Sequence, residues 1–242
     1  MVFLHGLGCD RGQFAGQWQG LNPGLRLLSL DLPGHGDSPE SPTGAYTVQS
    51  MADAVLDELR VRKLRGVVLV GHSAGGLVAL DIAVAHPDLV SGVLLIDSNM
   101  ALTAADRRVN RRRAEESETG DWRRHYMASM RDSWGPDDEA GDACLRAEVL
   151  RTLERASERV VRPFWHDILA FDPVDLCRRC PAPMLYVRSR RDTDLTVLRS
   201  LNPLISVVDL RPNCHGHWPH LQRPDLVNGI FHEFVAGLPK DG

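Results

Sequence analysis

Short apolar runs alternate along this chain with segments of helical periodicity, and the alternation predicts a parallel β-sheet covered by helices. The predicted strands are Val2–Leu4, Leu25–Leu30, Val67–Val70, Val93–Ile96, Met184–Val187 and Ile205–Leu210. The predicted helices that accompany them are Val48–Leu59, Ala74–His86, Asp194–Leu201 and Pro224–Val235. A strand that is apolar throughout, such as Val67–Val70, is typical of the middle of a sheet with both faces covered.

Two of the predicted helices have contrasting surroundings. The helix that follows Thr47, a plausible N-cap, carries apolar residues at every third or fourth position and should bury one face. These residues are Val48, Met51, Ala52, Val55, Leu56 and Leu59. The helix from Ala74 to about His86 is apolar almost all round, so it should be buried on most sides.

Residues 98–171 interrupt the alternation with helix-like, densely charged sequence. We interpret them as a helical cap insertion, with residues 1–97 and 172–242 forming the core. A basic run in the insertion is interpreted as a solvated helix face, the alternative being attraction of an anionic substrate. The run consists of Arg107, Arg108, Arg111, Arg112 and Arg113.

Composition narrows the functional class. The 242 residues are 43% hydrophobic and 25% charged, with a formal net charge of −4. This balance argues against a general nucleic-acid binder, and no apolar run has the length of a membrane span. The N-terminus shows no signal peptide, and five cysteines are an odd, sparse count for a disulfide framework. We therefore predict a cytoplasmic protein with mostly reduced thiols.

The strongest chemical signal is Gly71-His72-Ser73-Ala74-Gly75, which matches G-x-S-x-G between a predicted strand and a predicted helix. A serine in such a tight turn is exposed, and the helix N-terminus points free N–H groups at developing negative charge. Ser73 is therefore the candidate nucleophile.

A serine hydroxyl needs a base, and His217 is the best placed of the ten histidines. It follows the last predicted strand and precedes the last predicted helix, while His215 and His220 are less favoured neighbours. The three histidines could also be read as metal ligands, but no further ligand pattern completes a recognisable site. Cys177 and Cys180 form a CxxC without a second pair and are interpreted as ordinary thiols. No metal and no organic cofactor is predicted.

The acid that orients the histidine has three candidates. Asp192 follows the predicted strand Met184–Val187 by a short turn and is the preferred choice. Asp194 lies two residues further on, and Asp97, at the end of an earlier strand, is the more serious competitor.

An oxyanion needs two hydrogen-bond donors. We expect one to be the backbone N–H of Ala74, which follows the candidate nucleophile. The other is expected from the turn His5-Gly6-Leu7-Gly8 after the first strand, at the N–H of Leu7.

With these residues in place, the chain resembles the α/β-hydrolase-fold serine hydrolases that carry a helical cap. The matching motifs are His5-Gly6, Asp31-Leu32-Pro33-Gly34-His35-Gly36-Asp37-Ser38, the Ser73 turn, the strand leading to Asp192, and Gly216-His217-Trp218-Pro219-His220. The resemblance implies an α/β fold with a mostly parallel sheet flanked by helices and a helical cap insertion. It also assigns the catalytic roles to Ser73, Asp192 and His217.

The resemblance further implies that the chain begins at the third of eight strands and lacks the usual first two. Leu25–Leu30 would then be an exposed sheet edge, and unpaired edges template association. We therefore expect a homo-oligomer formed through this edge; the alternatives are a local loop that covers it, or a start site that trims a longer natural protein.

The expected activity is hydrolysis of a small-molecule carboxylic ester, thioester or lactone through an acyl-enzyme on Ser73, without nucleic-acid or membrane partners. The alternatives are a carbon–carbon bond hydrolase of the same fold and a slow-turnover small-molecule sensor that binds a partner protein. Large aromatic residues are predicted to line the substrate pocket. They are Trp122, Tyr126, Trp134, Trp165 and Trp218.

Overall fold

The computed structural model describes residues 1–135, 142–211, 213–214 and 216–239. Six strands form one parallel sheet in the order β2-β1-β3-β4-β5-β6. The strands are β1 (Val2–Leu4), β2 (Leu28–Leu30), β3 (Val67–His72), β4 (Val90–Ile96), β5 (Met184–Arg188) and β6 (Ile205–Asp209). The predicted parallel α/β sheet is confirmed, with β2 shorter and β4 longer than their apolar runs indicate.

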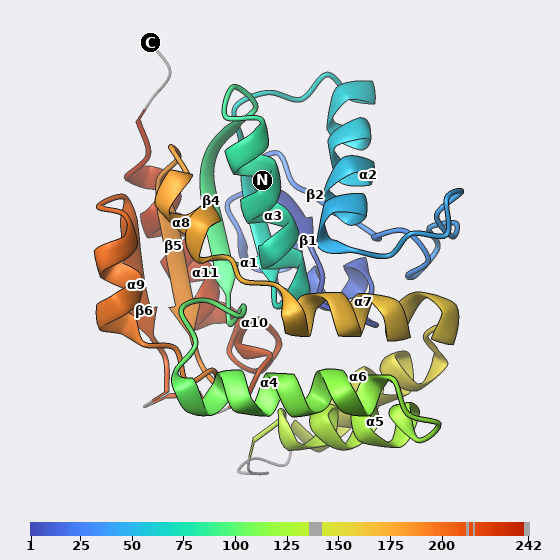
Figure 1. Ribbon diagram of the computed structural model, residues 1–242. Coiled ribbons are helices and arrows are strands. Elements are labelled where there is room, and N and C mark those ends of the chain that lie inside the picture. The colour runs from blue at the N-terminus through green and yellow to red at the C-terminus, as the bar shows by residue number, and fades with distance from the viewer. Residues whose placement is uncertain (136–141, 212, 215, 240–242) are drawn as a thin grey trace.

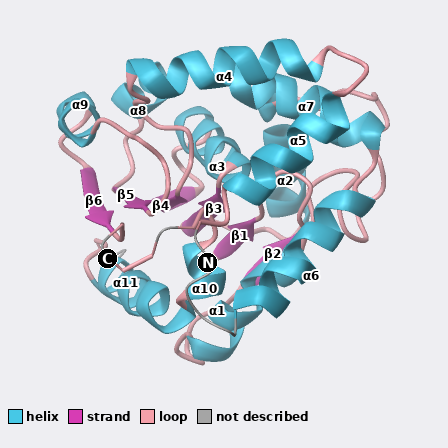
Figure 2. Cartoon of the chain, turned by 90° about the horizontal axis from the view of Figure 1, so that it is seen from below, coloured by secondary structure: helices cyan, strands magenta, loops and turns pink. Residues whose placement is uncertain are grey.

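Helices cover both faces of the sheet (Figure 2). On one side lie α2 (Val48–Val61), α3 (Ala74–Ala85) and α8 (Val174–Arg179), and on the other lie α1 (Ala15–Gly20) and α11 (Pro224–Ala236). Because side chains alternate along a strand, neighbouring residues of the same strand join different cores. Leu4 and Leu69 belong to the core under α2 and α3, whereas Phe3 and Val70 pack with Phe231 of α11.

Local sequence explains how α2 and α3 form. Thr47 caps α2 by accepting the N–H of Ser50, and the Ser50 side chain accepts the N–H of Thr47 in return. All six apolar residues predicted for the inner face of α2 are buried. Helix α3 is buried on nearly every side, as its composition predicts.

Between β4 and α8, the described residues form four helices. They are α4 (Ala104–Ser117), α5 (Trp122–Asp132), α6 (Asp142–Arg155) and α7 (Glu158–Ala170). In Figure 1 they lie together at one end of the sheet, below the strands in that view. They form the helical region expected for residues 98–171, and the exact division into core and cap stays a prediction.

The remaining helical segments are short. They are the 3₁₀ helix η1 (Arg11–Phe14), α9 (Leu195–Leu201) and α10 (Pro219–Gln222). Within the described residues, no helix combines the length and apolar character that a bilayer span requires.

Strand β2 is the sheet edge beside β1, as the resemblance implies. Only three residues pair with β1, and Trp18 donates its indole N–H to the Ser29 hydroxyl at 2.7 Å. Short edge strands are weak templates for pairing. Self-association through this edge therefore stays a prediction.

Candidate active site

Ser73 occupies the sharp turn between β3 and α3. Its backbone has φ 52° and ψ −115°, a region that residues other than glycine rarely adopt. Two glycines make the turn feasible because a Cβ at Gly71 would lie 2.2 Å from the Gly75 carbonyl oxygen. A Cβ at Gly75 would lie equally close, 2.2 Å, to the Leu4 carbonyl oxygen. The turn holds the Ser73 side chain partly exposed in an otherwise buried segment.

The imidazole of His217 is held by Asp97, the residue that follows β4. His217 Nδ1 donates to Asp97 Oδ2 at 2.7 Å, and both side chains are buried. With Nδ1 protonated, Nε2 of the neutral ring keeps its lone pair. His217 and Ser73 line the same small cavity, of about 30 Å³. The arrangement therefore provides a serine and a neutral imidazole around one space.

The other carboxylate oxygen of Asp97 is held by the loop after β5. Asp97 Oδ1 accepts the backbone N–H groups of Ser189, Arg190 and Arg191 at 2.8, 2.8 and 3.1 Å. Burial favours the neutral acid, but the hydrogen bond from His217 and the positive charge of Arg191 outweigh it and lower the Asp97 pKa. Asp97 is therefore held as a carboxylate beside the imidazole.

The preference for Asp192 as the acid partner of His217 is wrong. Asp192 is exposed, and its carboxylate accepts the Thr103 hydroxyl at 3.0 Å. Asp194 instead caps α9 by accepting the N–H groups of Thr196 and Val197. The physical reason is that the loop after β5 turns its backbone amides, rather than a carboxylate, toward the end of β4.

The electrostatics around His217 favour its neutral form. Burial and the positive charge of Arg191 lower the His217 pKa more than the contact with Asp97 raises it. A neutral imidazole is the form that can accept a proton. His217 is thus predisposed to act as a base at pH values below the ordinary range for histidine.

The two expected oxyanion donors lie on opposite sides of Ser73 along the chain. Ala74 is the first residue of α3, where a backbone N–H has no partner within its own helix. Leu7 follows β1 and lines the cavity with Ser73. Their role as donors to an oxyanion stays a proposal.

A buried hydrogen-bond network, centred on Gln13, connects the segments around the cavity. Gln13 Oε1 accepts the N–H of Gly6 at 2.9 Å, while its Nε2 lies 3.0 Å from His72 Nδ1 and 2.8 Å from His220 Nε2. His72 Nε2 in turn lies 2.7 Å from the carbonyl oxygen of His217. The amide donates both of its protons to imidazole nitrogens, so it ties the Gly6 turn to the His217 loop. The sequence reasoning missed Gln13, because no local motif surrounds it.

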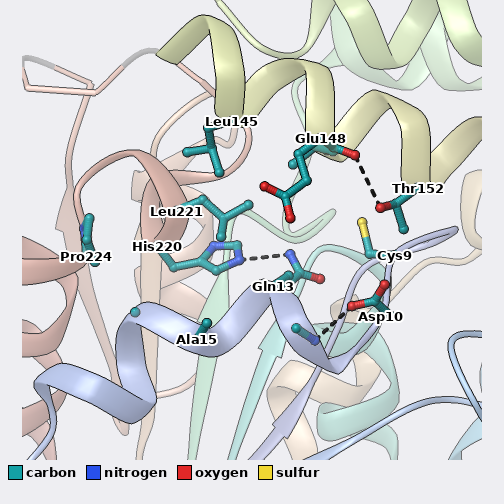
Figure 3. Close-up of a pocket in the computed structure, with 13 residues that line it drawn as sticks. Cys9, Asp10, Gln13, Ala15, Leu145, Glu148, Thr152, His220, Leu221 and Pro224 are labelled. Atoms are coloured by element: carbon teal, nitrogen blue, oxygen red, sulfur yellow. Dashed lines mark hydrogen bonds between the residues drawn. The ribbon is translucent and has the colours of Figure 1, made fainter. Parts of the chain in front are cut away.

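His220 therefore has a structural partner. Its ring stacks on Phe14 and points toward Gln13 (Figure 3). Burial, with a smaller effect of His217, lowers the His220 pKa to about 3, so the ring is neutral. His215, the third member of the suggested metal cluster, lies outside the described residues.

The five predicted aromatic residues separate into two groups. Trp165 and Trp218 line the cavity with Ser73. Trp122, Tyr126 and Trp134 are buried but do not line it, so the prediction is wrong for these three. They pack the helical region instead, as when the Trp122 indole donates to Glu158 at 2.9 Å and Tyr126 meets the Trp165 ring edge-on.

Two larger cavities adjoin the small one. A cavity of about 300 Å³ lies between α6 and the η1–α1 segment, and it shares Cys9 with the cavity at Ser73 (Figure 3). Another, of about 360 Å³, shares Asn99 and Leu169. The space at Ser73 itself is small, and the larger cavities nearby share walls with it.

Comparison with known proteins shows similarity to hydrolases in both sequence and fold. The sequence profile described as "Alpha/beta hydrolase family" matches residues 1–230. The sn-1-specific diacylglycerol lipase ABHD11 of Danio rerio is 37% identical over 260 residues, covering 95% of this chain and 76% of that protein. The pimeloyl-[acyl-carrier protein] methyl ester esterase of Yersinia enterocolitica is 38% identical over 106 residues, 44% of this chain and 39% of that protein.

Among solved structures, the enol-lactonase of Burkholderia xenovorans LB400 superposes with a TM-score of 0.81 at 22% identity. The superposition covers 97% of this chain and 90% of the lactonase. At this identity the likeness concerns the fold alone.

Proposed function

Because this chain belongs to the alpha/beta hydrolase family and is a hydrolase, we propose that it cleaves a carboxylic ester, thioester or lactone through an acyl-enzyme on Ser73. The names of its relatives, a lipase and a methyl ester esterase, favour an oxygen ester among these.

In the first half-reaction His217 Nε2 takes the proton of the Ser73 hydroxyl as Oγ bonds to the carbonyl carbon. The carbonyl oxygen becomes an oxyanion, held by the N–H groups of Leu7 and Ala74. The carbon–oxygen bond of the ester then breaks, and the leaving alkoxide takes the proton from His217. Asp97 remains a carboxylate throughout and stabilises the imidazolium.

In the second half-reaction a water molecule gives a proton to His217 and bonds to the acyl carbon. The bond from that carbon to Ser73 Oγ breaks, and Oγ recovers its proton from His217. The products are one alcohol and one acid, so neither an oxidant nor a cofactor is required.

The observation that carries this proposal is the Asp97–His217 hydrogen bond at a cavity that Ser73 also lines. A strained serine turn alone would fit several hydrolases and some non-catalytic relatives. The buried carboxylate supports a serine nucleophile in particular, because it fixes the tautomer of the base.

The test compares the native protein with Ser73→Ala on a panel of p-nitrophenyl esters, thioesters and lactones. We expect kcat to fall by on the order of 10³-fold or more for every substrate that the native protein turns over. Ser91→Ala is the matched control, because Ser91 lies at the start of β4 and donates to the Gly66 carbonyl. Unchanged turnover in a folded Ser73→Ala protein would refute the proposed mechanism.

A further inference from the structure

Two arginines face the small cavity that Ser73 and His217 line. Arg113 comes from α4, and Arg191 comes from the loop after β5. Both side chains are only partly exposed. Segments far apart in the sequence therefore bring two guanidinium groups to the reacting serine and histidine.

Neither guanidinium has a carboxylate partner among the residues that the structure describes. Arg191 Nε donates to the backbone carbonyl of Asp97 at 3.3 Å. The adjacent arginines are different: Arg112 pairs with Glu116 at 3.0 Å, and Arg190 pairs with Asp132 at 2.9 Å. Arg112 and Arg190 are therefore neutralised by carboxylates, whereas the two arginines at the cavity are not.

The two unpaired cations act on each other and on the site. Burial and the positive charge of Arg191 lower the pKa of Arg113, and the nearby carboxylates of Asp132, Asp106 and Glu116 offset this only in part. Holding two like charges together away from bulk water is unfavourable, and an anion between them relieves it. Guanidinium groups also match the geometry of a carboxylate, which they bind through two parallel hydrogen bonds.

We propose that Arg113 and Arg191 form a carboxylate-binding site beside Ser73, so that the preferred substrates are esters carrying a second, free carboxylate. This inference rests on the proposed hydrolysis and specifies its substrate class. The small volume at Ser73 requires side chains to rearrange when such a substrate binds, and Arg113 and Met130 are the flexible ones there.

Positive charge continues outward from this site. The adjoining cavity of about 360 Å³ is lined by Arg107 and Arg111, with Asp172 as its one acidic residue. An anionic substrate would therefore meet an excess of positive charge beside the cavity at Ser73, which raises the rate of productive encounter.

The kinetic test uses pairs of esters that differ only in charge. Mono-p-nitrophenyl glutarate and p-nitrophenyl valerate place the difference in the acyl half, and 4-acetoxybenzoate and 4-methylphenyl acetate place it in the alcohol half. We expect kcat/KM to favour the charged ester of at least one pair by roughly tenfold to a hundredfold, as for hydrogen bonds to charged groups. Arg113→Gln with Arg191→Gln should abolish that preference, measured as the ratio of kcat/KM for the charged ester to kcat/KM for its neutral partner at a pH above the acidic limb, so that any loss common to both esters cancels.

Matched controls are available next to each arginine. Arg112→Gln with Arg190→Gln removes the same charge from exposed positions outside the cavity, and it should keep the preference. Equal kcat/KM for both members of both pairs, or a preference that both double variants reduce equally, would overturn the carboxylate site.

A binding measurement separates this inference from the proposed hydrolysis. Calorimetry with Ser73→Ala protein and glutarate dianion should detect binding, and Arg113→Gln with Arg191→Gln in that background should abolish it. Glutarate binding without hydrolysis of any ester would retain the anion site and refute the proposed function. Hydrolysis of neutral esters without glutarate binding would retain the proposed function and refute the anion site.

Discussion

Replacing Asp97 by asparagine tests the assignment of the acid with little change in shape. The variant keeps an oxygen for the three backbone N–H groups of Ser189, Arg190 and Arg191, but it turns an amide NH₂ toward His217 Nδ1. That nitrogen must then accept, so the proton moves to Nε2 and the imidazole cannot deprotonate Ser73.

The expected losses of kcat and of stability in Asp97→Asn follow from these contacts. A wrong tautomer at a triad histidine costs on the order of 10⁴-fold in kcat, or about 5.4 kcal/mol of activation free energy. Three hydrogen bonds to a carboxylate also become bonds to a neutral oxygen. Since charge-assisted bonds are about twice as strong, we expect the free energy of unfolding to fall by about 2–4 kcal/mol.

The assay measures kcat on the best p-nitrophenyl ester and the urea midpoint of each variant. Asp192→Asn is the control, because this exposed residue loses only part of its contact with the Thr103 hydroxyl. It should stay within about twofold in kcat and about 0.5 kcal/mol in stability. A greater loss of kcat in Asp192→Asn than in a folded Asp97→Asn protein would refute the assignment.

Three further predictions concern pH, positioning and the sheet edge. Burial and the positive charge of Arg191 lower the pKa of His217, so kcat/KM for a neutral ester should fall only below the ordinary histidine range as pH decreases. Arg191→Gln removes the second of these causes and should move the acidic limb to higher pH; an unmoved limb would contradict the electrostatic argument. Gln13→Leu leaves the Gly6 N–H and two imidazole nitrogens without hydrogen-bond partners. We expect kcat to fall by about tenfold to a hundredfold, with a smaller change in KM. If thermal melting showed a loss of stability while kcat stayed intact, the network would be merely structural. Self-association through β2 should appear in light scattering across a concentration series and disappear in Leu28→Lys; a monomer at every concentration would count against it.

Much of the fold could be predicted from the sequence because the strands and helices are locally encoded. Val67–Val70 is apolar enough to be central, and the inner face of the helix after Thr47 follows from its periodicity. The Ser73 turn was predictable because Gly71 and Gly75 mark the close approach of strand and helix.

The partners of these residues could not be predicted with the same accuracy. Two aspartates, Asp97 and Asp192, follow parallel strands, and only the path of the loop after β5 decides which one reaches His217. The network of Gln13 joins residues more than 200 positions apart, to which no local pattern corresponds. The aromatic residues of the helical region were misassigned in part, since their side-chain directions depend on how α4–α7 pack together.

The central claim, an acyl-enzyme on Ser73, is tested most directly by mass spectrometry of the trapped intermediate. The protein is mixed with a p-nitrophenyl ester, quenched in acid within milliseconds, and digested for peptide mapping. The account predicts a mass increase equal to one acyl group on the peptide that contains Ser73, and no such increase in Ser73→Ala. Release of p-nitrophenol with acyl mass on another residue, or with no covalent adduct in any variant under single-turnover conditions, would contradict it.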